Sequence, residues 1–132
     1  MDCQSRLQST GSSILKRRVF KVTKSMPLPS YQMATVGTVD IITYVPEMPK
    51  EPLQMVFSCN KVDIYGLGES IHGTLTEYRP DTFGITKPIK YVFSLDSFAG
   101  GHLVIFNDNT ALHMIYGSGV PCMYAYYGTL TK

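Results

Sequence analysis

Short apolar runs alternate with turn-forming residues along most of this chain, a pattern typical of strands and turns rather than helices. In the last third of the chain, clusters of Gly, Asn, Asp and Pro separate the apolar runs 90–95, 102–106, 111–116 and 122–130. Earlier in the chain, the same pattern predicts strands at 14–23, 32–45, 53–59, 62–65 and 70–78. The predicted fold class is therefore all-β, as a single-domain antiparallel β-sandwich or barrel of about eight short strands.

The turn-forming residues at 107–110 predict how the strands of the C-terminal meander pair. Asn and Asp tolerate the backbone of a tight turn, so all four residues are assigned to the turn and Phe106 pairs with Ala111. The next turn pairs Tyr116 with Cys122. Because side chains alternate across a strand, both faces of the meander are then apolar. Such a sheet is covered on both sides, by a second sheet, a barrel interior or another subunit.

The same register places His102 and His113 on one face of the sheet, diagonally across the hairpin. Two imidazoles at the roughly 7–8 Å of a diagonal pair are within reach of one metal ion, with a carboxylate as third ligand. Packing at an apolar face is the commoner role of such residues, so no metal is expected. A catalytic pair of Cys122 with His113 is disfavoured because the two lie on opposite predicted faces. With no nucleophile or cofactor motif in the chain, neither an enzyme nor a cofactor is expected.

Charge divides the chain near residue 24. Residues 1–24 carry a net charge of +5, whereas residues 25–132 carry −3. This division predicts a flexible basic arm that runs into a first edge strand, followed by one all-β domain over 25–132. The candidates for contacting phosphate groups or an anionic surface are Lys16, Arg17, Arg18, Lys21 and Lys24. They suit a nucleic-acid backbone or anionic lipid, although a solvated edge strand that binds nothing accounts for the same charges.

The joint after this arm reads Pro-Leu-Pro-Ser-Tyr at 27–31. Its first role is that of a linker that stops the first strand. It also resembles the Pro/Tyr motifs that dock on WW domains, in which Pro29 and Tyr31 would fill an aromatic groove. A WW-type domain is therefore an alternative partner for this joint.

Three tyrosines near the C-terminus, Tyr124, Tyr126 and Tyr127, are predicted to form an exposed aromatic ladder. Exposed aromatic rings stack on bases and are enriched at protein interfaces. Ordinary packing within the sheet is the alternative.

The three cysteines, Cys3, Cys59 and Cys122, show neither a CxxC pair nor metal-ligand spacing. They are expected to be free thiols in a reducing compartment. The N-terminus lacks the apolar run of a signal peptide, and no apolar segment approaches the roughly 20 residues of a membrane span. A cytoplasmic location is predicted.

Strands that are apolar on both faces, many Tyr and Met, and a basic arm favour a protein that acts by contact. The leading hypothesis is a non-enzymatic structural protein that self-assembles into a homo-oligomer and contacts RNA, DNA or an anionic membrane through its arm. This layout of arm, Pro/Tyr joint and β body is similar to that of small viral capsid and matrix proteins, a likeness that carries over no residue. The first alternative is a monomeric β-sandwich module that binds a small ligand or glycan at the Tyr-rich face or at the loops 66–69 and 117–121. The second is a small metal-dependent β-barrel enzyme that uses His102 and His113.

Overall fold

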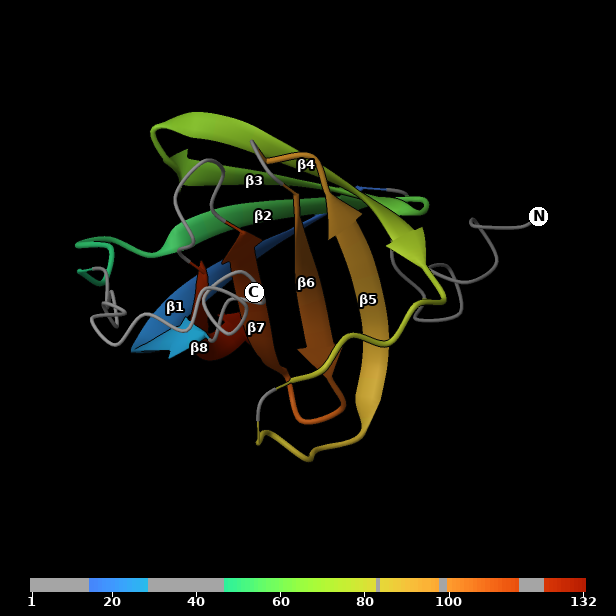
Figure 1. Cartoon of the computed structure of the whole chain (residues 1–132). Coiled ribbons are helices and arrows are strands. Elements are labelled where there is room, and N and C mark those ends of the chain that lie inside the picture. Colours follow the sequence, from blue (N-terminus) through green and yellow to red (C-terminus); the bar gives the residue numbers. More distant parts are fainter. Residues whose placement is uncertain (1–14, 29–46, 83, 98–99, 117–122) are drawn as a thin grey trace.

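The computed structural model describes residues 15–28, 47–82, 84–97, 100–116 and 123–132. Its strands are β1 (Leu15–Leu28), β2 (Leu53–Ser58), β3 (Lys61–Leu67), β4 (Glu69–Thr76), β5 (Ile89–Leu95), β6 (Gly101–Phe106), β7 (Thr110–Tyr116) and β8 (Met123–Thr131). Each strand pairs antiparallel with the next, and β8 pairs with β1, so that the sheet closes into a barrel (Figure 1). The predicted all-β class is confirmed, and of the two predicted architectures the barrel is the one found. The predicted strand at 32–45 lies outside the described residues.

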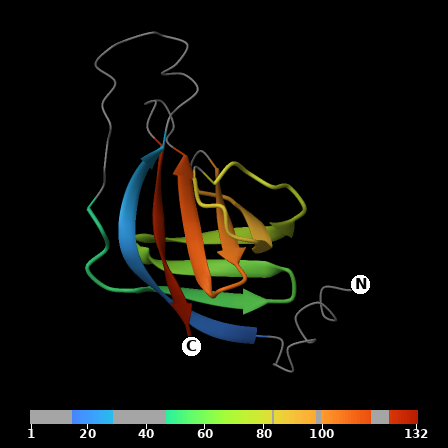
Figure 2. The same ribbon diagram turned by 90° about the horizontal axis from the view of Figure 1, so that it is seen from below.

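The strands wrap around one apolar core. The green strands β2 to β4 cross the orange and red strands at a steep angle (Figure 2), and one face of every strand points inward. The buried members of this core are Phe20, Leu53, Met55, Phe57, Val62, Ile64, Ile71, Phe93, Leu95, Leu103, Ile105, Ala111 and Tyr126. The alternation that makes 53–59 a strand is confirmed, because Leu53, Met55 and Phe57 all point into the core.

A second apolar cluster lies on the outside of β5 to β8. Its buried members are Val92, Val104, Phe106, Leu112, Met114 and Ala125. The connection between β4 and β5 crosses this face of the barrel (Figure 1) and packs Ile85 against the cluster. The prediction that these strands are apolar on both faces is confirmed, and part of the outer cover comes from the chain itself.

Lys87 fastens this connection to the sheet. Its ammonium group donates hydrogen bonds to the hydroxyl of Tyr127 and, at 3.1 Å, to that of Thr110. It also lies 2.7 Å from the carboxylate of Asp108 and 5.9 Å from the centre of the Phe106 ring. The hydrogen bond from Lys87 is the main reason why the pKa of Asp108 is lowered to about 2.

β1 is longer than predicted and is not an edge strand. The sequence predicts a strand over 14–23 at the edge of the sheet, whereas Leu15–Leu28 pairs first with β2 and then with β8. Closure of the barrel removes the edge. The predicted boundary between arm and domain, at residue 24, therefore falls inside a strand of the barrel.

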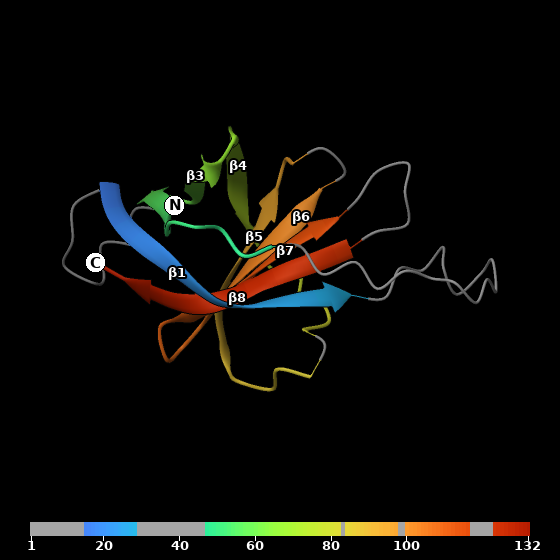
Figure 3. The same ribbon diagram turned by 90° about the vertical axis from the view of Figure 1, so that its left-hand side faces the viewer.

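A β-bulge reverses the faces of β1 midway. The register with β8 shifts between Val22 and Lys24, so Val22 packs in the barrel core and Met26 packs in the outer cluster. A bulge adds bend and twist to its strand, and Figure 3 shows β1 bending alongside β8. Gly128 allows this close approach, because a Cβ there would lie 2.0 Å from the backbone oxygen of Lys21.

The predicted pairing of β6 with β7 is wrong by one residue. Ile105, rather than Phe106, pairs with Ala111. The N–H of Asn109 donates to the carbonyl of Phe106 at 3.3 Å, and Asn109 has a left-handed backbone with a φ of 68°. A turn closed in this way holds three residues. Thr110, which is expected in the turn from its residue type, is already part of β7.

The predicted pairing of β7 with β8 is wrong by one residue as well. Tyr116 pairs with Met123 instead of Cys122. Each one-residue slip exchanges the inner and outer faces of the strand concerned. Relative to β7, both neighbouring strands therefore present the opposite faces from those predicted.

Candidate ligand site at one end of the barrel

One end of the barrel is lined with tyrosines. It is formed by the turn between β3 and β4, the residues that follow β5, the last residues of β7, the first residues of β8 and the segment 47–52 that leads into β2. Its aromatic residues are Tyr65, Tyr116, Tyr124 and Tyr126. We call it the tyrosine end.

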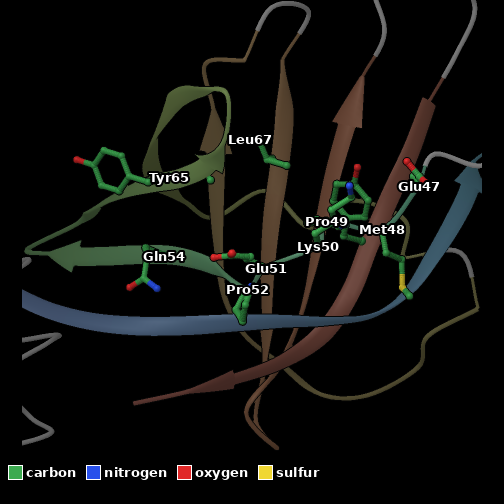
Figure 4. Close-up of a pocket in the computed structure, with 11 residues that line it drawn as sticks. Glu47, Met48, Pro49, Lys50, Glu51, Pro52, Gln54, Tyr65 and Leu67 are labelled. Carbon is green, nitrogen blue, oxygen red and sulfur yellow. The ribbon is translucent and has the colours of Figure 1, made fainter.

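The described residues of the tyrosine end line two cavities. The first has a volume of about 680 Å³ and lies between the segment 47–52 and the side chains of Tyr65 and Leu67 on β3 (Figure 4). The second has a volume of about 570 Å³ and extends from Leu67 to Ile115 of β7. Leu67 and Tyr126 line both cavities, so the two meet at these side chains. Both volumes fall within the roughly 300–1,000 Å³ of sites for small organic ligands.

The charge of this lining is mainly negative. The carboxylates are Glu47, Glu51, Glu69 and Asp96, and Lys50 is the one basic residue among the described residues of the two linings. A concave surface lined with one sign of charge concentrates ions of the opposite sign. The predicted loop 66–69 supplies Gly66, Leu67 and Glu69 to this lining, whereas the predicted loop 117–121 lies outside the described residues. Sequence reasoning missed the other carboxylates, because only the closed barrel brings their segments to one end.

The C-terminal tyrosines do not form one exposed ladder. Tyr124 and Tyr126 face the barrel interior with their ring centres 5.5 Å apart, and Tyr126 is only 5% exposed. Tyr127 lies against the outer cluster, where its hydroxyl accepts the hydrogen bond from Lys87. The predicted exposed ladder is therefore wrong, because alternation places neighbouring residues on opposite faces and the barrel encloses one face.

His113 lies directly beneath the tyrosine end. It pairs across the sheet with Tyr126, and the two rings meet edge-on with centres 6.4 Å apart. It is 0% exposed, and among the described residues neither ring nitrogen has a hydrogen-bond partner. Burial lowers the pKa of His113 to about 4, so the ring is neutral near pH 7.

His102 lies on the outer face of the sheet, in contact with other residues. Its Nδ1 is 2.5 Å from the hydroxyl of Tyr116, and its ring centre is 5.1 Å from that of Tyr78. Burial raises the pKa of Tyr116 to about 12. Because the sheet separates His102 from His113, the predicted arrangement of both on one face is wrong. Across the residues that the structure describes, no group of three or more His, Cys, Asp or Glu is placed to hold a metal ion.

The five basic candidates divide between the two faces of β1. Lys16 and Arg18 pair with core residues of β2 and therefore share the inner face of the strand, whereas Arg17 and Lys21 lie on the outer face. Lys24 follows the bulge and lies on the outer face too. The five do not form one continuous basic surface.

Lys16 and Arg18 instead gather with two basic residues that are distant in sequence. Lys132 follows β8, whose last residues pair with β1, and Lys90 lies near the start of β5. All four lie at the same end of the barrel, where β1 and β5 begin and β8 ends. Burial and then the charges of Arg18, Lys132 and Lys90 hold the pKa of Lys16 below its usual value. They lie at the end of the barrel opposite the tyrosine end, and we call them the basic end.

The remaining predictions concern the three cysteines and the two docking residues of the Pro/Tyr joint. Cys59 is disulfide-bonded, so the prediction of a free thiol is wrong for this residue. Cys3 and Cys122, like the predicted docking residues Pro29 and Tyr31, lie outside the described residues.

Comparison with protein-family models, curated proteins and solved structures finds no match to this chain. In the described part of the chain, no helix has the length and apolar character that crossing a membrane requires. A barrel of this kind supports many unrelated functions, so function has to be inferred from the site itself.

Proposed function

We propose that the protein is a non-enzymatic module that binds a small organic ligand at the tyrosine end. The observation that carries this proposal is the meeting of two cavities, of about 680 and 570 Å³, at Leu67 and Tyr126. Eight-stranded barrels have an interior wide enough for side chains or for one small ligand. The mouths of such barrels are preferred positions for ligand sites.

The lining favours a neutral or cationic ligand. Tyrosine rings offer flat apolar surfaces and attract cations to their faces. The carboxylates Glu69 and Asp96 of the second cavity accept hydrogen bonds from hydroxyl or ammonium groups, and they repel anions. A glycan, one of the ligands predicted from the sequence, is among the neutral candidates.

The test is a set of NMR titrations with four named compounds. Methyl glucoside and p-cresol represent neutral ligands, choline represents cations and citrate represents anions. We expect at least one of the first three to shift the ring signals of Tyr65 and Tyr124, and citrate to shift neither. Absence of any shift with all of the first three, or stronger binding of citrate, would contradict the proposal.

A pair of variants distinguishes the cavity from the rest of the surface. Tyr124→Ala removes a ring from the second cavity, and we expect it to weaken binding of the active compound at least tenfold. Tyr78→Ala is the control, because Tyr78 is 58% exposed and lines neither cavity. Equal loss of binding in both variants would place the binding site elsewhere.

Contact with a nucleic-acid backbone through the basic end is a second candidate function. The observation that favours it is the gathering of Lys16, Arg18, Lys90 and Lys132, for which the described residues provide no ion pair with an acid. Neutralising several phosphates releases counterions and makes binding sensitive to salt. Two alternatives predicted from the sequence are tested together with this candidate. The basic end could instead contact an anionic membrane, and the protein could self-assemble as a structural protein of the viral type.

This candidate is tested by two matched double variants of β1. Lys16→Gln with Arg18→Gln removes two charges from the inner face, and Arg17→Gln with Lys21→Gln removes two from the outer face. In anisotropy titrations with a 20-nucleotide oligo(dT), we expect the inner pair alone to weaken binding and to lower the salt slope by about 1.4. Equal effects of both pairs would contradict a role for the basic end. Binding to anionic vesicles alone would favour a membrane.

Self-assembly is tested by measuring the mass of the native protein in solution. Light scattering of a homo-oligomer returns a mass that is a multiple of 14.7 kDa, and a monomer would argue against a structural role.

We also propose an oxidising compartment in place of the cytoplasm. Cys59 is disulfide-bonded, and disulfides persist where thiols are not kept reduced.

A further inference from the structure

The ring of His113 is a polar group inside an apolar core. It is fully buried, and neither nitrogen forms a hydrogen bond with any residue that the structure describes. Buried polar groups are almost always satisfied, and an exception indicates strain, a functional role or an absent water or ligand. A phenylalanine would fill nearly the same space without this penalty, so the imidazole calls for a functional explanation.

The position of His113 connects it to the proposed ligand site. Ile115 lines the second cavity, and His113 follows two residues deeper on the same inner face of β7. On β8, Tyr124 lines the cavity and is partly exposed, whereas Tyr126 lines its floor at 5% exposure. Tyr126 links the two, because it lines the cavity and its ring also contacts the ring of His113.

The chemistry around His113 restricts what can reach it. Among the described residues, the other buried side chains of the core carry no charge, so none of them would balance a charge carried in by a ligand. A neutral imidazole has one donor and one acceptor nitrogen. A hydroxyl group suits either nitrogen, because it both donates and accepts hydrogen bonds.

We propose that the ligand bound at the tyrosine end displaces the ring of Tyr126 and hydrogen-bonds to His113 through a neutral hydroxyl group. The ligand class is then an alcohol or phenol with an apolar body. This inference rests on the proposed ligand-binding function and narrows it. His113 acts as a specificity-determining residue, since the apolar walls around it do not distinguish a hydroxylated ligand from its hydrocarbon analogue.

The test compares p-cresol with toluene, which has the same shape except for the hydroxyl. Affinities for both are measured by NMR titration on the native protein and on His113→Phe. We expect the preference for p-cresol over toluene to fall at least tenfold in the variant, because its phenyl ring offers no hydrogen bond to the hydroxyl. An unchanged preference would overturn the inference.

A second measurement needs no variant. The ring ¹⁵N signals of His113 are followed as p-cresol is added to the native protein, and we expect one of them to shift on saturation. His72 is an internal control, because its ring already contacts Asp63 and it lines neither cavity. If the His113 signals do not move, the inference is rejected. It is also rejected if the signals show, before p-cresol is added, that the ring already forms a hydrogen bond with a buried water.

These outcomes separate the inference from the function on which it rests. Suppose that choline or methyl glucoside shifts the ring signals of Tyr65 and Tyr124 while p-cresol leaves those of His113 unmoved. The ligand-binding function then stands and the role of His113 falls. If no compound binds, both are rejected.

Discussion

His113 departs from the rule that buried polar groups are paired. Leaving a buried hydrogen-bonding group without a partner costs about 1–3 kcal/mol, and native proteins accept such costs mainly at functional sites. The imidazole also lies beneath the two cavities of the tyrosine end. Both facts make His113 the residue whose replacement is most informative.

The first prediction concerns the pH dependence of stability. The pKa of His113 is about 4 in the folded protein and about 6.5 when unfolded. The unfolded state therefore binds more protons than the folded state between these pH values. The stability that depends on a neutral His113 is fully present above pH 6.5 and is lost as the pH falls towards 4. Between pH 7.5 and 4.5 we expect His113 to account for a loss of about 2–3 kcal/mol.

Urea unfolding at the two pH values measures this loss. His113→Phe serves as the reference, because it lacks the titrating ring and retains all other ionisable groups. We expect the native protein to lose more free energy of unfolding than the variant. Equal losses in the two proteins would show that His113 is not held neutral by burial.

At the scale of the elements, turns and bulges decide which face of a strand points inward. The hydrogen bond from Asn109 to Phe106 closes a three-residue turn, and this single bond shifts the register of β6 against β7. The bulge after Val22 reverses the faces of β1 in the same way. Both effects act through the two-residue period of a strand, in which one step exchanges its faces.

The second prediction concerns the seam between β1 and β8. A Cβ at Gly128 would lie 2.0 Å from the backbone oxygen of Lys21, and backbone cannot move aside as a flexible side chain can. We expect Gly128→Ala to lower the free energy of unfolding by about 1–3 kcal/mol or more. Thr129→Ala, at the exposed position next to it, is the control and is expected to change stability by less than about 0.5 kcal/mol. Similar denaturation midpoints for both variants would contradict this account of the seam.

At the scale of the whole molecule, closure of the barrel converts a charge division along the chain into a division between its ends. The sequence places a net charge of +5 in residues 1–24. In the fold, Lys90 and Lys132 join the inner-face cations of β1 at the basic end, while four carboxylates lie at the tyrosine end. The two ends are therefore suited to different partners.

The third prediction concerns the thiols. The chain has three cysteines, and Cys59 is disulfide-bonded, so we expect one titratable thiol per denatured chain without reductant and three after reduction. Reduction is expected to lower the free energy of unfolding by about 2–4 kcal/mol. Three thiols before reduction would contradict the disulfide and favour the cytoplasmic location predicted from the sequence.

The local pattern of the chain is enough to predict the fold class and the inward positions of strands such as 53–59, because alternation repeats every two residues. It also shows that the C-terminal strands are apolar on both faces, which the two clusters confirm. The pairing of β1 with β8, the one-residue registers and the separation of His102 from His113 depend on closure, a bulge and one turn hydrogen bond. The local pattern reveals only part of the tyrosine end, the loop 66–69 and the C-terminal tyrosines. The rest is assembled from segments far apart in sequence, and the cavities exist only once the barrel has closed.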